Sequence, residues 1–122
     1  MNFNRIATAV AALTLLSASG ASAHHSGAMF DRAKEVTLTG VVKEWQWTNP
    51  HTWLRLVVET DKGGPAEWNI EGQSPQVHRG RGWTRTVFKP GDKVTVKVHP
   101  LRDGALGGSI MSVTAADGKT YN

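Results

Sequence analysis

The histidines near the start of the chain have the residue type and spacing best suited to chemistry. His24 and His25 directly follow Ala21-Ser22-Ala23, the small-x-small pattern that a signal peptidase cuts. Cleavage after Ala23 would make His24 the amino terminus, and a terminal histidine offers its α-amine and its ring nitrogen to one metal ion. A third nitrogen would complete a T-shaped site suited to copper, because copper prefers imidazole ligands and tetragonal geometry. The sequence therefore predicts a copper-type metal site at His24.

His51 is the first candidate for the third ligand of this metal site, because Pro50 restricts the backbone of its loop. His25 and His99 are the next candidates. Neutral histidine is also the commonest metal ligand among side chains. The alternative interpretation is that His24 and His25 form a solvated terminus that binds metal weakly. A separate alternative for His51 is that it only hydrogen-bonds carbonyl groups of its own loop.

A second possible binding site comes from the tryptophans, three of which lie within nine residues around Asn49-Pro50. Trp53 shares the polar face of its predicted strand with Arg55, and Trp47 lies close by. Tryptophan and arginine together can form a stacking platform for a sugar or an aromatic ligand. The alternative is that Trp53 is an ordinary, partly covered surface residue. The remaining tryptophans are expected in the core: Trp45, Trp68 and Trp83.

Composition and charge argue against several classes of function. The chain has 14 basic and 10 acidic residues, and they are scattered without the basic stripe that is typical of nucleic-acid-binding proteins. It has no cysteine, which excludes disulfides and thiol chemistry. The acidic residues stand singly, and there is neither a Gly-x-Ser-x-Gly elbow nor a P-loop. We therefore expect no nucleic-acid partner and no enzymatic activity.

The first residues have the features of a signal peptide that is removed on export. A short basic segment ends at Arg5, and the stretch Ile6–Ala18 is almost wholly apolar or small. This run is shorter than the roughly 20 residues of a membrane span, so we expect no stable membrane span. The prediction is a periplasmic protein with a signal peptide at 1–23, an N-terminal arm at 24–34 and one domain at 35–122.

Alternating apolar residues predict a domain built mainly of strands. The first strand, residues 36–47, changes its apolar phase at Gly40, which indicates a bulge there. Val41 is then expected to face inward, with Val42 as the alternative. The following strands are expected at 51–60, 67–71, 93–99 and 109–115, with a last small hairpin that ends at Tyr121.

A short helix interrupts these strands. Ser74-Pro75 combines an N-cap residue with proline at the first helical position, and Gly80 and Gly82 end the helix, which is predicted at Pro75–Arg79. His78 on this helix is expected to face solvent. The order of three strands, one helix and two strands predicts an all-β fold with one short helix, a small OB-fold-like five-stranded Greek-key barrel. Another small barrel or sandwich is the alternative.

Several motifs resemble those of one family. They cover nearly the whole of residues 24–122 and include Ala-His-His-Ser at 23–26, Thr48-Asn49-Pro50-His51, Gly82-Trp83 and Lys89-Pro90-Gly91-Asp92. The chain is similar to a proteobacterial family of small exported proteins that is catalogued as a domain of unknown function. The resemblance implies export and a single small domain. It implies no particular catalytic or binding residue.

The sequence as a whole favours an exported small binding protein whose ligand is copper or a similar metal. Two alternatives from other classes stay open. One is an OB-type module that binds a small molecule or a glycan through Trp53, Arg55 and Trp47. The other is an accessory subunit that docks on another periplasmic protein.

Overall fold

A computed structural model describes residues 27–122 of the chain. The predicted signal peptide and the two N-terminal histidines, His24 and His25, lie outside these residues. In the described part of the chain, no helix has both the length and the apolar character needed to cross a membrane.

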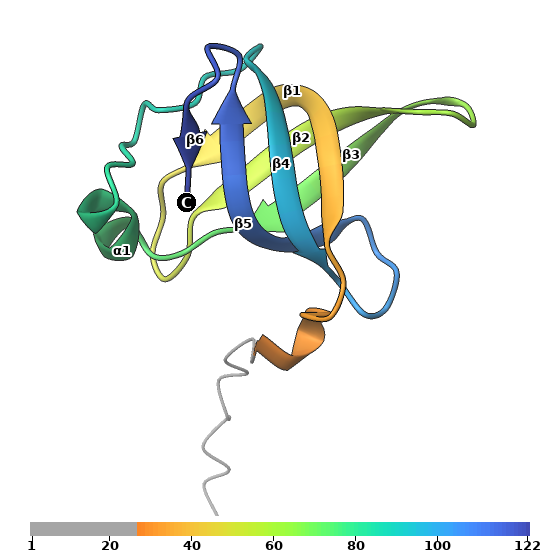
Figure 1. The fold of residues 1–122 in the computed structure, drawn as a ribbon, viewed down its shortest axis with the longest axis horizontal. Coiled ribbons are helices and arrows are strands. Elements are labelled where there is room, and N and C mark those ends of the chain that lie inside the picture. The colour runs from red at the N-terminus through yellow and green to blue at the C-terminus, as the bar shows by residue number, and fades with distance from the viewer. Residues whose placement is uncertain (1–26) are drawn as a thin grey trace, which may run out of the picture.

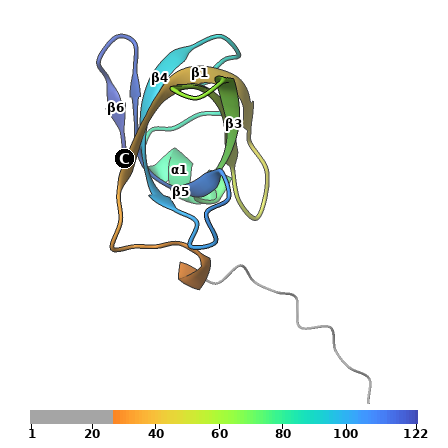
Figure 2. The same cartoon turned by 90° about the vertical axis from the view of Figure 1, so that its right-hand side faces the viewer.

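A barrel of strands with one short α-helix makes up the described residues (Figure 1). Its elements are the 3-10 helix η1 (Gly27–Met29), strands β1 (Val36–Gln46), β2 (Trp53–Thr60) and β3 (Gly64–Glu71), helix α1 (Pro75–Gly80), and strands β4 (Lys93–Pro100), β5 (Gly107–Ala115) and β6 (Thr120–Tyr121). Neighbouring strands run in the order β3-β2-β1-β4-β5-β6, and parallel pairing of β3 with β5 closes the sheet. Figure 2 shows the closed ring. The predicted OB-like fold class is confirmed.

Strand β1 bends around the barrel with its bulge at a different residue from the one predicted. The register against β2 shifts between Val42 and Glu44, so the bulge lies at Lys43 and the prediction of a bulge at Gly40 was wrong. Val42 consequently faces inward, 1% exposed, whereas Val41 is 37% exposed. Gly40 is required for another reason: a Cβ there would collide with a backbone carbonyl oxygen of β2. The phase change therefore comes three residues later than the glycine.

The barrel interior is filled by alternate residues of the long strands. The apolar face of β2 and all three valines of β4 point inward. Such alternation follows from the two-residue period of a strand, which sends successive side chains to opposite faces. The side chains with no exposed surface include Leu54, Leu56, Ile70, Val96, Val98 and Val113.

Helix α1 covers one end of the barrel and begins as predicted. The Ser74 hydroxyl caps it by accepting a hydrogen bond from the Val77 N–H at 3.3 Å. Beneath the helix lies a cluster of aromatic rings, in which Trp45 and Trp83 have centroids 5.8 Å apart. Both rings are buried, so their prediction as core residues is confirmed. Trp68 packs against the same core and is partly buried.

The prediction that His78 faces solvent was wrong. His78 is 2% exposed, and its ring centroid lies 4.1 Å from that of Trp83. Its Nε2 accepts a hydrogen bond from the Gln73 N–H at 3.1 Å and lies 3.0 Å from the Thr52 hydroxyl. Burial, with a smaller effect of the nearby Arg81 charge, lowers the pKa of His78 to about 4. His78 is therefore a neutral core residue at ordinary pH.

The arm that precedes β1 packs against the barrel. Phe30 forms a β-bridge with Leu101 and is 6% exposed. The Asp31 N–H donates to the Pro100 carbonyl at 2.8 Å, which ties the arm to the end of β4. Figures 1 and 2 show the arm beneath the loop that joins β4 and β5. Residues 27–34 are thus held at one end of the barrel.

Candidate functional site

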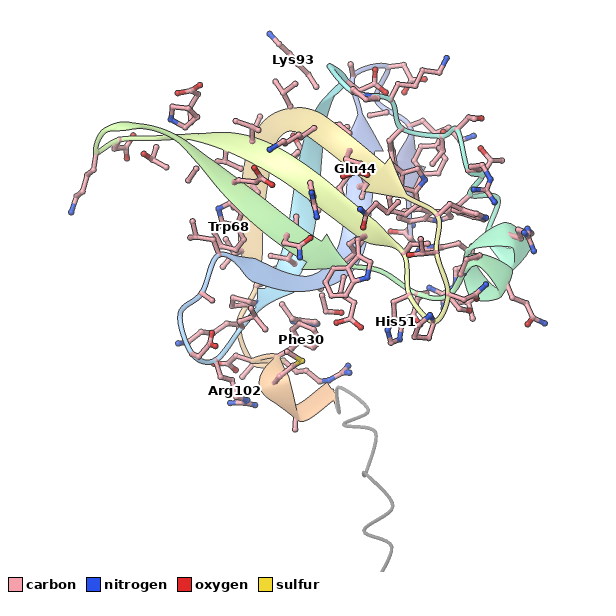
Figure 3. The ribbon with its side chains drawn as sticks, turned by 180° about the vertical axis from the view of Figure 1, so that it is seen from behind. Phe30, Glu44, His51, Trp68, Lys93 and Arg102 are labelled. Atoms are coloured by element: carbon pink, nitrogen blue, oxygen red, sulfur yellow. The ribbon has the colours of Figure 1, made fainter. Side chains whose placement is uncertain are left out.

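The loop between β1 and β2 carries a histidine that is paired with a buried carboxylate. His51 Nδ1 lies 2.7 Å from Glu71 Oε1, and the two side chains are 36% and 8% exposed. Glu71 is the last residue of β3, and His51 lies just before β2, so the pairing of these two strands brings the groups together. Figure 3 shows His51 and Phe30 on the same lower side of the barrel. This His51–Glu71 pair is the centre of the candidate site.

Backbone hydrogen bonds hold the two partners of the pair in place. The Thr52 N–H donates to the Gln73 carbonyl at 3.0 Å, and the Gly72 N–H donates to the Thr52 carbonyl at 2.8 Å. These bonds extend the β2–β3 pairing beyond the strand ends. Thr52 itself has no exposed surface. The Thr48 hydroxyl also donates to the His51 carbonyl, at 2.7 Å. His51 therefore has a rigid support.

The chemistry of the pair follows from its geometry. A histidine that donates its Nδ1–H to a carboxylate presents Nε2 as a basic nitrogen in a defined direction. Metal-binding histidines almost always have such an outer partner, which sets the tautomer and orients the ring. Within residues 27–122, no cluster of three or more histidine, aspartate or glutamate side chains is placed to hold a metal ion. By itself the pair offers one potential metal ligand, His51 Nε2.

A small cavity adjoins the pair and is bordered by the arm. It has a volume of about 180 Å³. Gly27, the first described residue, lines it together with His51 and Glu71. Arg32 brings a positive charge to the same cavity. Its remaining lining residues are Phe30, Gly72, Gln73 and Ser109. The fold therefore delivers the start of the described chain to the His51–Glu71 pair.

A larger groove also borders Glu71 and lies over the outer face of β2 and β3. Its volume is about 300 Å³. Trp53 lines it and is paired directly with Glu71 in the β2–β3 ladder. The arm and the β4–β5 loop form its other walls. The remaining lining residues are Met29, Phe30, Asn69, Leu101, Ala105, Leu106, Gly107 and Gly108.

The structure separates the three residues of the predicted stacking platform. Trp53 and Arg55 lie on the outer face of β2, but Arg55 pairs with Glu44 at 3.3 Å and does not line the groove. Trp47 is 8% exposed and packs in the core, with its ring centroid 5.9 Å from that of Trp45. Of the three predicted residues, Trp53 lines the groove, together with residues of β3 and of the β4–β5 loop.

Of the other predicted metal ligands, the described residues include only His99. Its Nδ1 lies 2.8 Å from the Lys34 carbonyl oxygen, so this ring helps to hold the arm. His99 is paired in the β4–β5 ladder with Ser109, which lines the cavity beside His51. His24 and His25 lie outside the described residues.

Sequence reasoning missed Glu71, because it is one of several single acidic residues. The alternation in β3 puts it on the outer face with Glu67 and Asn69, where a solvated side chain is the ordinary expectation. Glu71 is nevertheless 7% exposed, and Phe30 and the β4–β5 loop line the cavities that it borders. No local pattern in the sequence indicates such a cover.

The fold resembles that of a known solved structure. The crystal structure of the mitochondrial single-stranded DNA binding protein Rim1 from S. cerevisiae matches with a TM-score of 0.52 and 10% sequence identity. The match covers 68% of this chain and 93% of that one. At this low identity the likeness concerns the fold alone. No curated protein matches the sequence.

The sequence also matches the model of a protein family. The family is described as a family of unknown function (DUF6152), and the match covers residues 12–111, which is more than half of the chain. The chain therefore belongs to this family.

Proposed function

We propose that this member of the family is an exported binding protein that holds a copper-type metal ion between its N-terminus and His51. The observation that carries the proposal is that Gly27 and His51 line one cavity, with His51 oriented by the buried Glu71. Such a site needs an oriented histidine and a nearby segment that leads to the N-terminus, and Gly27 follows His24 by three residues.

Chain reach supports this arrangement. His24 precedes Gly27 by three residues, and an extended chain spans at most about 3.6 Å per residue, or about 11 Å in all. A cavity lined by Gly27 is therefore within reach of the His24 α-amine and ring. His25 is closer still to Gly27 in the sequence.

The donor atoms suit copper better than harder metals. An α-amine and two imidazoles are nitrogen ligands, which favour copper and zinc over calcium or magnesium. Glu71 prepares His51 as a ligand, because a carboxylate bonded to one ring nitrogen sets the tautomer and the direction of the other. Arg32 opposes a cation in the same cavity, and the Glu71 carboxylate offsets that charge.

Export is the second half of the proposal, because His24 becomes an amino terminus only by cleavage after Ala23. It is supported by the basic start, the apolar run and the small-x-small pattern of residues 1–23. Cell fractionation and mass spectrometry of the mature chain test it. A periplasmic species that begins at His24 is expected, and a chain that retains residue 1 would contradict export.

The metal site is tested with two forms of the protein, one beginning at His24 and one with a single glycine in front. Copper(II) is titrated into each, and the spin-resonance spectrum is recorded. The His24 form should bind more tightly and show coupling to several nitrogens, because only there do the amine and ring form one chelate. Equal, weak binding by both forms would contradict the proposal.

Single substitutions then identify the third ligand. His51→Gln should weaken copper binding and remove one nitrogen from the spectrum, because the ligand atom of the ring is lost. His99→Gln is the matched control, since the His99 ring is engaged with the Lys34 carbonyl. If the spectrum instead loses one coupled nitrogen in His99→Gln but not in His51→Gln, the third ligand is His99 on β4 and not His51.

A further inference from the structure

We infer that the groove over β2 and β3 binds a small, uncharged aromatic molecule that carries a hydroxyl or N–H group, of the phenol or indole type. The inference goes beyond the proposed metal site and does not depend on it, because the groove is built entirely from residues 29–108. Its ligand would lie beside Glu71, which borders both the groove and the His51 cavity.

The walls of the groove favour a flat apolar ring. Trp53 provides an aromatic face, and Met29, Phe30, Leu101 and Leu106 surround it. A volume of about 300 Å³ lies at the small end of ligand pockets, which suits one ring system and not an extended molecule. Leu106 is 49% exposed, one of the most exposed large apolar residues in the described chain. Covering it would remove apolar surface from water.

The polar groups of the groove are few and select for a hydrogen-bond donor. Asn69 and Glu71 are two residues apart on β3 and lie on its outer face. Glu71 uses Oε1 for His51, so its second oxygen can accept a hydrogen bond from a ligand. Glu71 is also the single ionisable residue in the lining. A neutral donor fits this environment, whereas a carboxylate would be repelled.

The same composition argues against a sugar. Each hydroxyl group that enters a pocket without a partner carries a desolvation cost. Two polar side chains serve one or two donors of an aromatic alcohol, but they leave most hydroxyls of a pyranose without partners. An aromatic ring, by contrast, gains from stacking on Trp53 in an offset or edge-to-face arrangement.

The groove is held rigidly by contacts between its backbone segments. The Asn69 N–H donates to the Leu106 carbonyl at 3.1 Å, and the Leu101 N–H donates to the Gly107 carbonyl at 3.0 Å. A Cβ at Gly107 would lie 2.9 Å from the Asn69 carbonyl oxygen, so only glycine allows the loop to approach β3 this closely. A pre-formed pocket loses little entropy when it binds a ligand.

The test uses metal-free protein, prepared with a chelator, so that its result is separate from that of the copper titration. Phenol and indole are titrated while backbone amide shifts are followed by NMR. Glucose and benzoate are the comparison ligands. We expect saturable shifts at Asn69, Leu106 and Gly107 with phenol or indole. Glucose and benzoate should produce neither saturation nor shifts of similar size.

Two variants localise the binding. Trp53→Ala should weaken phenol affinity by about tenfold, because the stacking face is lost. Leu106→Ala should weaken it less, and this exposed residue can be changed without risk to the fold. Val77→Ala, at an exposed valine on α1, is the matched control and should bind as the unaltered protein does.

Several results would overturn the inference. These are the absence of saturable shifts, equal binding of glucose or benzoate, and affinities that do not differ between Leu106→Ala and Val77→Ala. If Trp53→Ala does not fold, the Leu106→Ala comparison decides the matter. A failure of this test would leave the copper result standing, since that result depends on His24 and His51.

Discussion

His51 Nδ1 lies 2.7 Å from Glu71 Oε1, although the two residues are separated in the chain by all of β2 and β3. The carboxylate is buried and the ring is partly exposed. The Glu71 carboxylate is therefore a fixed hydrogen-bond acceptor for His51 Nδ1. The other ring nitrogen of His51, Nε2, points away from it. Metal-binding histidines almost always have such an outer partner.

Replacement of Glu71 by glutamine tests whether the carboxylate tunes the metal ligand. Glu71→Gln keeps the size of the side chain and removes its charge. Copper affinity should fall by about 10- to 100-fold, the usual effect of losing an outer partner of a metal ligand. The measurement is competitive titration of the His24 form. Glu44→Gln, at a surface carboxylate paired with Arg55, is the control and should leave affinity unchanged. Equal affinities for all three proteins would count against the site.

Stability should depend on pH through His78. Its pKa is about 4 in the folded chain, against 6.5 as the ordinary value. Between these values the unfolded chain binds more protons than the folded one, so the free energy of unfolding should fall as the pH falls from 6.5 towards 4. Above pH 6.5 His78 is neutral in both the folded and the unfolded chain, so it does not change the free energy of unfolding with pH. Urea unfolding at a series of pH values measures the effect.

The control for this pH dependence is His78→Gln, whose side-chain oxygen can still accept the Gln73 N–H. The variant should be less stable at neutral pH, because the aromatic packing with Trp83 is altered. Its stability should decline less than that of the unaltered chain as the pH falls. Parallel declines would show that other groups, and not His78, cause the dependence.

Gly40 should tolerate no side chain. Gly40→Ala places a Cβ against the carbonyl oxygen of Val57 on the paired strand, so β1 or β2 must shift. We expect a loss of about 1–3 kcal/mol in the free energy of unfolding. Gly80→Ala is the control, because a Cβ at this last residue of α1 meets nothing within 4 Å. Thermal unfolding measures both, and equal values would refute the close approach.

The arm should contribute to stability through Phe30. Phe30→Ala removes a ring that is 6% exposed and bridges to Leu101, and the expected loss is about 3 kcal/mol. Amide exchange should also rise at Asp31, whose N–H is bonded to the Pro100 carbonyl. Val77→Ala again serves as the control. A loss below that of the control would mean that the arm is not packed on the barrel in solution.

Most of the strands and the helix could be predicted because their signals are local. A strand alternates with a period of two, so the inward valines of β4 are visible in four or five residues. The cap at Ser74 and the proline after it define the start of α1 in the same way. Gly40 misled the prediction because a glycine marks either a bulge or a close backbone approach, and the two have the same sequence pattern.

The residues around the candidate site could be predicted only in part. His51 and Trp53 stand out by type and by their place beside a turn. Their partners do not: Glu71 reaches His51 through the register of β2 and β3, and Phe30 of the arm lines both cavities that Glu71 borders. His78 lies on a helix of six residues, too short for a helical period to show which side faces the core.

The sequence by itself determined the fold class, the order of strands and helix along the chain, and the histidines and tryptophans of interest. It could do so because hydrophobic period, caps and turns act over a few neighbouring residues. Only the tertiary structure decided which side chains meet. Pairing of β2 with β3 brings His51 to Glu71. Pairing of β3 with β5 forms one side of the groove beside Trp53. Packing of the arm brings Gly27 to the cavity beside His51. These contacts join residues far apart in the chain, where register and burial depend on the whole barrel.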